Sequence, residues 1–93
     1  MEELPGEDLV RKGVADLERG IESVEALLVS IGAPRLEGLG FEVPNPIPSP
    51  ELRLYELLAR EDSDSAHSQY NALVRRLVSF ERAADFVIRQ RTD

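Results

Sequence analysis

The feature that most constrains the fold is a pair of regularly spaced apolar series, one near each end of the chain. In the first, the gaps alternate between four and three residues without interruption. Its members, which we call the first seam, are Val10, Val14, Leu17, Ile21, Val24, Leu28 and Ile31. This spacing puts all of them on one face of an α-helix. We therefore expect a helix from about residue 8 to 31.

Gly32 and Pro34 predict where this helix stops, because glycine can adopt the left-handed C′ conformation and proline does not continue a helix. Two further glycines, Gly13 and Gly20, lie seven residues apart on one side of the predicted helix. Each costs a helix about 1 kcal/mol relative to alanine. Either a neighbouring backbone approaches closely at both positions, or the two glycines are simply tolerated.

The second series predicts a helix from about residue 65 to 89. Its members, the second seam, are Ala66, Tyr70, Leu73, Leu77, Phe80, Ala84 and Val87. Val74, Val78 and Ile88 widen this apolar face, so we expect the helix to contact more than one neighbour. Three arginines recur every seven residues on the opposite face and are either solvated or docked to an acidic partner: Arg75, Arg82 and Arg89.

Between the seams, residues 32–49 predict a loop. Five of the six prolines fall between residues 32 and 50, and proline is excluded from helix interiors and central strands. The segment also contains apolar residues, and long loops of this kind are often functional. Either these residues fold back over the ends of the helices, or three of them contact a partner: Leu39, Phe41 and Ile47.

A short helix is expected at about residues 50–60. Ser49 is suited to the N-cap, Pro50 to the first helical position and Glu51 to the first turn. The leucines and Tyr55 that follow make the segment apolar on most of its circumference, so we expect it to be well buried.

Together these elements predict an all-α protein with one helical domain spanning residues 1–93. Two long amphipathic helices and one short helix would form a hairpin-like unit. A single hairpin leaves the wide stripe of the last helix uncovered, and a chain of 93 residues buries only a modest core by itself. We therefore expect two copies to pair through both seams into the four-helix bundle core of a homodimer.

Composition narrows the classes of function and partner. The formal net charge of −7 argues against nucleic-acid binding, which depends on neutralising phosphates with Lys and Arg. No cysteine is present, so disulfides, thiolate metal sites and cysteine nucleophiles are excluded. No apolar run approaches the roughly 20 residues that span a bilayer, so we expect a cytoplasmic protein without membrane association. The strong preference for arginine over lysine favours a bacterial source.

Motifs for chemistry are sparse, and no ionisable residue falls on either seam. We therefore expect no enzymatic activity and no cofactor. His67 is the only histidine, and the spacing Asp64-x-x-His67 resembles the Glu-x-x-His of ferritin-like di-iron bundles. Glutamates of the first helix would supply further metal ligands across a dimer: Glu18, Glu22 and Glu25.

Other uses of His67 stay open at this point. An exposed histidine near a helix start in a dimeric bundle resembles the histidine phosphotransfer modules of two-component signalling. Its spacing from Arg60 resembles that of some helical ribonucleases, although the residues between them are acidic. It could also be an ordinary surface histidine. The reading that the sequence favours is a small bacterial protein–protein interaction or oligomerisation module, which binds through its loop, its arginine face or a second copy.

Overall fold

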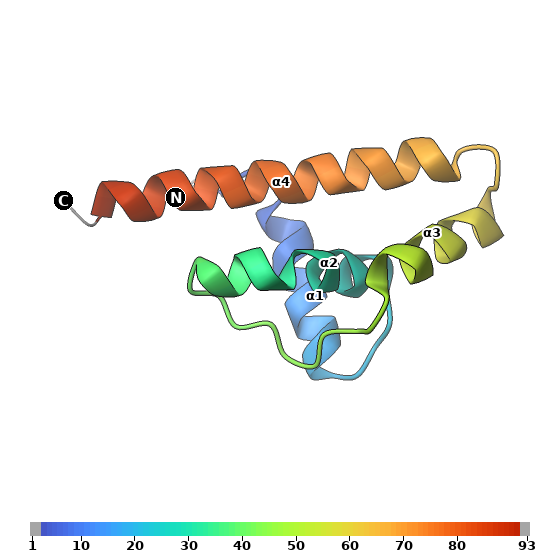
Figure 1. Cartoon of the computed structure of the whole chain (residues 1–93), viewed down its shortest axis with the longest axis horizontal. Coiled ribbons are helices and arrows are strands. Elements are labelled where there is room, and N and C mark those ends of the chain that lie inside the picture. The colour runs from blue at the N-terminus through green and yellow to red at the C-terminus, as the bar shows by residue number, and fades with distance from the viewer. Residues whose placement is uncertain (1–2, 92–93) are drawn as a thin grey trace.

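The computed structural model describes residues 3–91, and this part of the chain contains four helices and no strand (Figure 1). The helices are α1 (Glu7–Glu18), α2 (Val24–Gly38), α3 (Pro50–Glu61) and α4 (Ala66–Arg91). The prediction of an all-α protein is confirmed. At 1.5 Å per residue, the 26 residues of α4 span about 39 Å, so this helix accounts for most of the molecule's longest dimension of 47 Å.

The single helix expected over residues 8–31 is wrong, because the chain turns between α1 and α2. Gly20 adopts a left-handed conformation with φ of 70°. Its N–H donates to the carbonyl of Leu17 at 3.1 Å, and the N–H of Ile21 donates to the carbonyl of Asp16 at 2.8 Å. This pair of bonds is the Schellman motif, which satisfies the last carbonyls of a helix. The regular spacing of the first seam therefore runs through a turn, and its residues are divided between two helices.

Ser23 begins α2 and ties it to α1. Its Oγ accepts a hydrogen bond from the N–H of Ala26 at 3.1 Å and donates to the carboxylate of Asp16 at 2.6 Å. Lys12 donates to the same carboxylate oxygen at 2.7 Å. These bonds favour the ionised acid, with Lys12 the larger cause, and lower the pKa of Asp16. One side chain thus joins the end of α1 to the N-cap of α2.

The stop expected at Gly32 and Pro34 is also wrong, since α2 continues through both to Gly38. Gly32 is buried against α4, where a Cβ would meet the side chains of Leu77 and Glu81 at about 3.0 Å. Pro34 is exposed, while its neighbours Ala33 and Leu36 are buried. Burial of this apolar side offsets the hydrogen bond that proline removes.

The irregular segment is therefore shorter than the expected loop of residues 32–49. A second Schellman motif ends α2: Gly40 has φ of 99°, and the N–H of Phe41 donates to the carbonyl of Leu36 at 3.0 Å. Further along, the N–H of Ile47 donates to Ser30 Oγ at 3.0 Å. This bond and the burial of Val43 hold the proline-rich segment against the helices. This agrees with the alternative in which the apolar residues of the segment fold back onto the helices.

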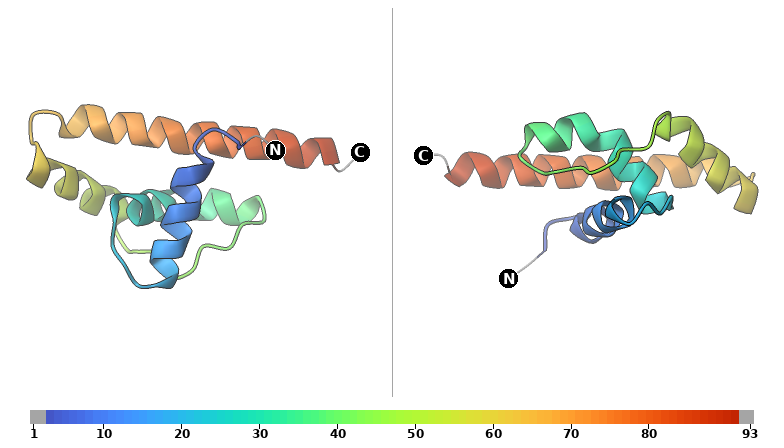
Figure 2. Two further views of the ribbon diagram at one scale, coloured as in Figure 1. Left: turned by 180° about the vertical axis from the view of Figure 1, so that it is seen from behind. Right: turned by 90° about the horizontal axis from the view of Figure 1, so that it is seen from below.

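Helix α2 lies at the centre of the fold and packs against each of the other three helices. α1 crosses behind it in the view of Figure 1 and begins beside α4, which runs alongside α2 (Figures 1 and 2). Several side chains of α2 are fully buried in the core, namely Leu27, Leu28, Val29 and Leu36. The carboxyl-terminal end of α4 extends beyond α2 in both figures.

The expected burial of α3 on most of its circumference is wrong. Leu54 and Leu58 are buried, but Leu52 is 60% and Tyr55 41% exposed. Ser49 occupies the N-cap position, as expected, yet it is left-handed and its side chain makes no capping hydrogen bond.

Gly13 explains how α1 and α2 approach so closely. A Cβ at this position would overlap the backbone carbonyl of Glu25 and a methyl group of Val29. Of the two alternatives left open by the sequence, the close approach of a backbone therefore holds at Gly13. At Gly20 a Cβ would meet nothing within 4 Å, so close packing does not require a glycine there. Glycine instead suits the left-handed backbone conformation of the turn.

We predict that Gly13→Ala lowers the free energy of unfolding by about 1–3 kcal/mol, although alanine is the better helix former, because the added methyl forces α1 away from α2. Gly38→Ala is the matched control: its Cβ meets nothing within 4 Å, and we expect no loss of stability. Urea denaturation followed by circular dichroism measures both. Equal stability of Gly13→Ala and wild type would contradict the close contact.

Candidate functional groove

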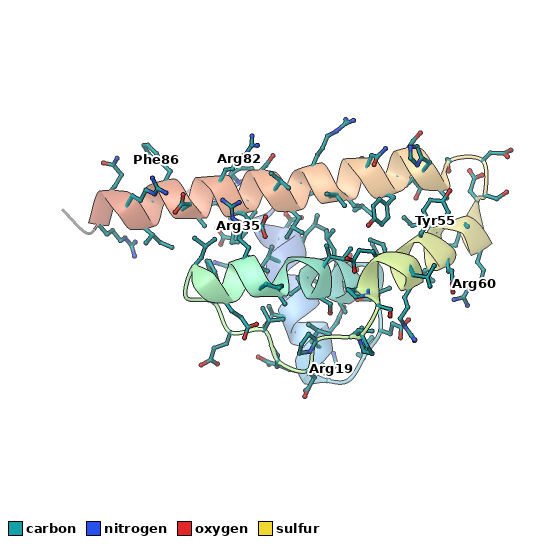
Figure 3. The ribbon with its side chains drawn as sticks, in the orientation of Figure 1. Arg19, Arg35, Tyr55, Arg60, Arg82 and Phe86 are labelled. Carbon is teal, nitrogen blue, oxygen red and sulfur yellow. The ribbon has the colours of Figure 1, made fainter. Side chains whose placement is uncertain are left out.

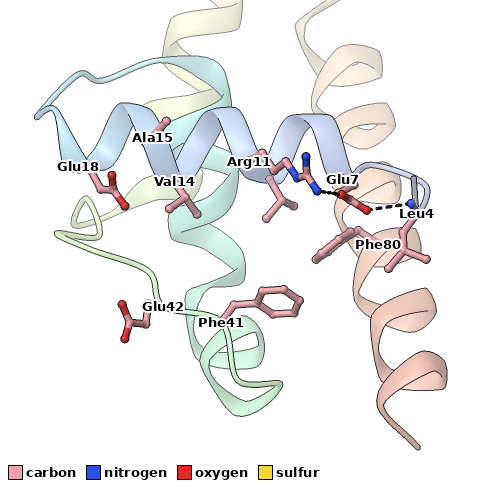
Figure 4. A pocket seen from close by; sticks show the side chains of 10 residues that line it. Leu4, Glu7, Arg11, Val14, Ala15, Glu18, Phe41, Glu42 and Phe80 are labelled. Carbon is pink, nitrogen blue, oxygen red and sulfur yellow. Dashed lines mark hydrogen bonds and ion pairs between the residues drawn. The ribbon is translucent and has the colours of Figure 1, made fainter. Parts of the chain in front are cut away.

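An apolar groove of about 520 Å³ lies on the side where α1 crosses (Figure 4). α1 forms one wall, the start of the α2–α3 segment another, and Phe80 of α4 closes the end. Its apolar lining consists of Leu4, Val10, Val14, Ala15, Phe41 and Phe80. The rings of Phe41 and Phe80 lie 5.4 Å apart between centroids and are tilted by 55°. This volume falls in the range of functional binding pockets.

The backbone turns at the end of α2 and before α1 place these side chains in the groove. The Schellman motif at the end of α2 directs the chain so that Phe41 enters the groove. At the other end, a Cβ on the left-handed Gly6 would lie 3.3 Å from Phe80 Cβ. An Asp8–Arg76 ion pair at 3.3 Å also holds the start of α1 to α4.

The rim of the groove is acidic. Three carboxylates, Glu7, Glu18 and Glu42, and one guanidinium, Arg11, border the apolar lining. Glu7 pairs with Arg11 and accepts a hydrogen bond from the N–H of Leu4 at 3.0 Å (Figure 4). Glu18 and Glu42 are exposed and form no ion pair with any of residues 3–91. The groove therefore presents two unneutralised carboxylates beside an apolar surface.

The seam residues predicted to bind a second copy are largely used within one chain. Seven seam residues are buried in the core, namely Val10, Leu17, Leu28, Ala66, Leu77, Phe80 and Ala84. The other members, apart from Ile21, are partly buried: Val14, Val24, Ile31, Tyr70, Leu73 and Val87. Ile21 is 40% exposed beside the turn. The helices of a single chain therefore cover most of both seams.

The predicted interaction residues divide into two groups. Leu39, Phe41 and Ile47 pack partly buried against the core, and of these Phe41 lines the groove. On α4, the three arginines of the predicted arginine face are exposed, namely Arg75, Arg82 and Arg89. Arg82 points away from the core beside Phe86 (Figure 3). Arg89 is hydrogen-bonded to Asp85 at 3.3 Å.

The candidate metal ligands do not converge within one chain. Across residues 3–91, no three His, Asp or Glu side chains are grouped so that they could hold a metal ion. Glu22 pairs with Arg53 at 2.5 Å, Glu25 lies 3.5 Å from Lys12, and Glu18 borders the groove. Asp64 lies in the turn before α4, and the ring of His67 is 3.2 Å from the amide of Asn71.

Sequence reasoning missed Glu81, which is only 5% exposed. It lies one residue after a seam position and faces Gly32, where the missing side chain of α2 makes room for its carboxylate. Burial raises the pKa of Glu81, and the charge of Arg35 opposes the shift. The groove rim was missed as well, because Glu42 reaches Glu7 and Arg11 of α1 only after the chain has turned at Gly20 and Gly40.

No family matches this chain, and no curated protein or solved structure is significantly similar to it. The class that the structure defines is thus a small all-helical protein with an acidic-rimmed apolar groove. Within residues 3–91, none of the helices combines the length and apolar character that crossing a membrane requires.

Glu81 gives a pH-dependent prediction. A carboxyl group whose pKa is raised in the folded state contributes stability that is fully present below its unfolded-state pKa and is lost as the pH rises through the folded value. We therefore expect Glu81→Gln to unfold at a higher temperature than wild type at pH 7, with the difference shrinking toward pH 4. Calorimetry across this range tests it, with the exposed Glu56→Gln as control. A Glu81→Gln variant less stable than wild type at pH 7 would contradict the assignment.

Proposed function

We propose that the chain is a non-enzymatic protein–protein interaction module and that the groove between α1, Phe41 and Phe80 is its binding surface. The observation that carries the proposal is the combination of an apolar lining of about 520 Å³ with an acidic rim. Covering an apolar surface of this kind removes it from water and lowers the free energy, which favours binding of a partner. Within residues 3–91, no three His, Asp or Glu side chains are grouped so that they could hold a metal ion.

The apolar lining and the acidic rim of the groove favour a helical segment of a protein as its occupant. An amphipathic helix binds a groove through apolar anchors three or four residues apart. The carboxylates of Glu18 and Glu42 favour positive charge beside those anchors and disfavour anionic ligands such as fatty acids or nucleotides. The expected partner segment is therefore apolar on one face and carries Lys or Arg at its edges.

The homodimer expected from the sequence stays part of this proposal in a modified form. Both seams are mostly covered within one chain, so a dimer would use the apolar surface that is left. That surface includes the groove, the exposed side of α4 near its carboxyl end, where Phe86 is 63% exposed, and the exposed side of α3, where Leu52 is 60% exposed. Location in a bacterial cytoplasm also stays a prediction.

Selection of helical peptides from a random library tests the binding surface. We expect the enriched peptides to carry apolar anchors at helical spacing together with Lys or Arg. Val14→Asp, which puts a charge into the apolar lining, should weaken their binding about tenfold or more. Leu52→Asp on the exposed face of α3 is the matched control and should bind like wild type.

Fluorescence anisotropy with labelled peptides measures the affinities, and circular dichroism confirms that both variants fold. Failure to enrich any peptide, or equal affinities for wild type and Val14→Asp, would refute the groove as a binding surface. Loss of binding in Leu52→Asp alone would place the surface on α3.

A further inference from the structure

We propose that the groove binds the carboxyl-terminal part of α4 from a second copy of this chain, so that two copies exchange these segments in a symmetric dimer. We call residues 82–91 the α4 tail. The inference rests on the proposed function, since it names the occupant of the same groove. Three features of the α4 tail support this pairing: its uncovered apolar surface, its charge, and its position next to the groove.

The tail carries apolar side chains that its own chain leaves partly or largely uncovered. Phe86 is 63% exposed, the largest exposed fraction among the large apolar residues of the described chain. Val87 and Ile88 are only partly buried, because α4 extends beyond α2 at this end (Figures 1 and 2). A second copy that covers these side chains would remove from water an apolar helix end that the monomer cannot cover.

The charges of the tail complement those of the groove. The tail contains three arginines and one aspartate, whereas the groove rim contains three glutamates and one arginine. Arg82 forms no ion pair with any of residues 3–91 and points outward beside Phe86 (Figure 3). Glu18 and Glu42 are likewise unneutralised. Docking the tail into the groove brings these opposite charges together at the edge of an apolar contact.

The two surfaces lie next to each other, which allows the contact to close into a dimer. Phe80 ends the groove, and Val87 follows it two helical turns later on the same seam of α4. A two-fold axis beside this point would place each tail over the other copy's groove, giving two identical contacts. Such an isologous interface closes and does not propagate into fibres.

A charge-exchange experiment tests the pairing. The groove variant carries Glu18→Arg and Glu42→Arg, and the tail variant carries Arg82→Glu and Arg91→Glu. Each variant alone opposes like charges in both contacts of its dimer. In a mixed dimer, the reversed groove meets the reversed tail, and the unchanged groove meets the unchanged tail. We therefore expect wild type to dimerise, each variant to dimerise at least about tenfold more weakly, and the equimolar mixture to recover dimerisation.

Native mass spectrometry and sedimentation velocity read out these states, because the mixed dimer differs in mass from either homodimer. Arg19→Glu with Arg60→Glu is the matched control, since it makes the same charge change away from the tail (Figure 3) and should leave the dimer intact. Phe86→Ala alters an exposed position and keeps the fold, so it provides a second test. We expect it to weaken dimerisation about tenfold or more.

The proposal is overturned if wild type is monomeric, if the reversed variants dimerise like wild type, if the mixture fails to recover a dimer, or if Phe86→Ala has no effect. A monomer whose groove still binds the selected peptides would refute the second copy as occupant and leave the proposed function standing. A monomer that binds none of them would refute both.

Discussion

The rest of the structure depends on the turn that joins α1 to α2. Asp16 accepts hydrogen bonds from both Lys12 and Ser23, and Ser23 in turn caps α2. This network fixes the direction in which α2 leaves α1, and Gly13 lets the two helices pack with their backbones close together. A straight helix over residues 8–31 would leave one face of α2 uncovered and would form no wall for the groove. The turn therefore creates both the core around α2 and the candidate binding surface.

The sequence predicted the helical class and the positions of α3 and α4 because their signals are local. An uninterrupted apolar periodicity marks α4, and Ser49 and Pro50 mark the start of α3. The break near Gly20 was missed because the first seam keeps its spacing through the turn, and that spacing by itself cannot distinguish one helix from two. Gly20 and Ser23 were nevertheless adequate signals for a C′ residue and an N-cap. At Gly32 and Pro34, in contrast, tertiary burial overrides a local stop signal.

The candidate groove could not be predicted from a sequence pattern in the way that the helices could. Its lining comes from the segment before α1, from α1, from the residues after α2 and from α4. Val14 and Phe80 belong to the seams and Phe41 to the predicted interaction loop, yet nothing in their spacing indicates that they meet. The acidic rim likewise joins Glu18 and Glu42, which are far apart in sequence. The sequence predicted an apolar interaction surface, whereas its location required the three-dimensional arrangement.

Isotope-filtered nuclear Overhauser measurements would show directly whether the groove of one copy holds the α4 tail of another. The sample would mix ¹³C-labelled and unlabelled protein, so that only contacts between copies are detected. We predict contacts from the ring of Phe86 in one copy to the methyl groups of Val14 and Leu4 in the other. Intermolecular contacts confined to Leu52 and Tyr55 of α3, or none at all, would contradict it.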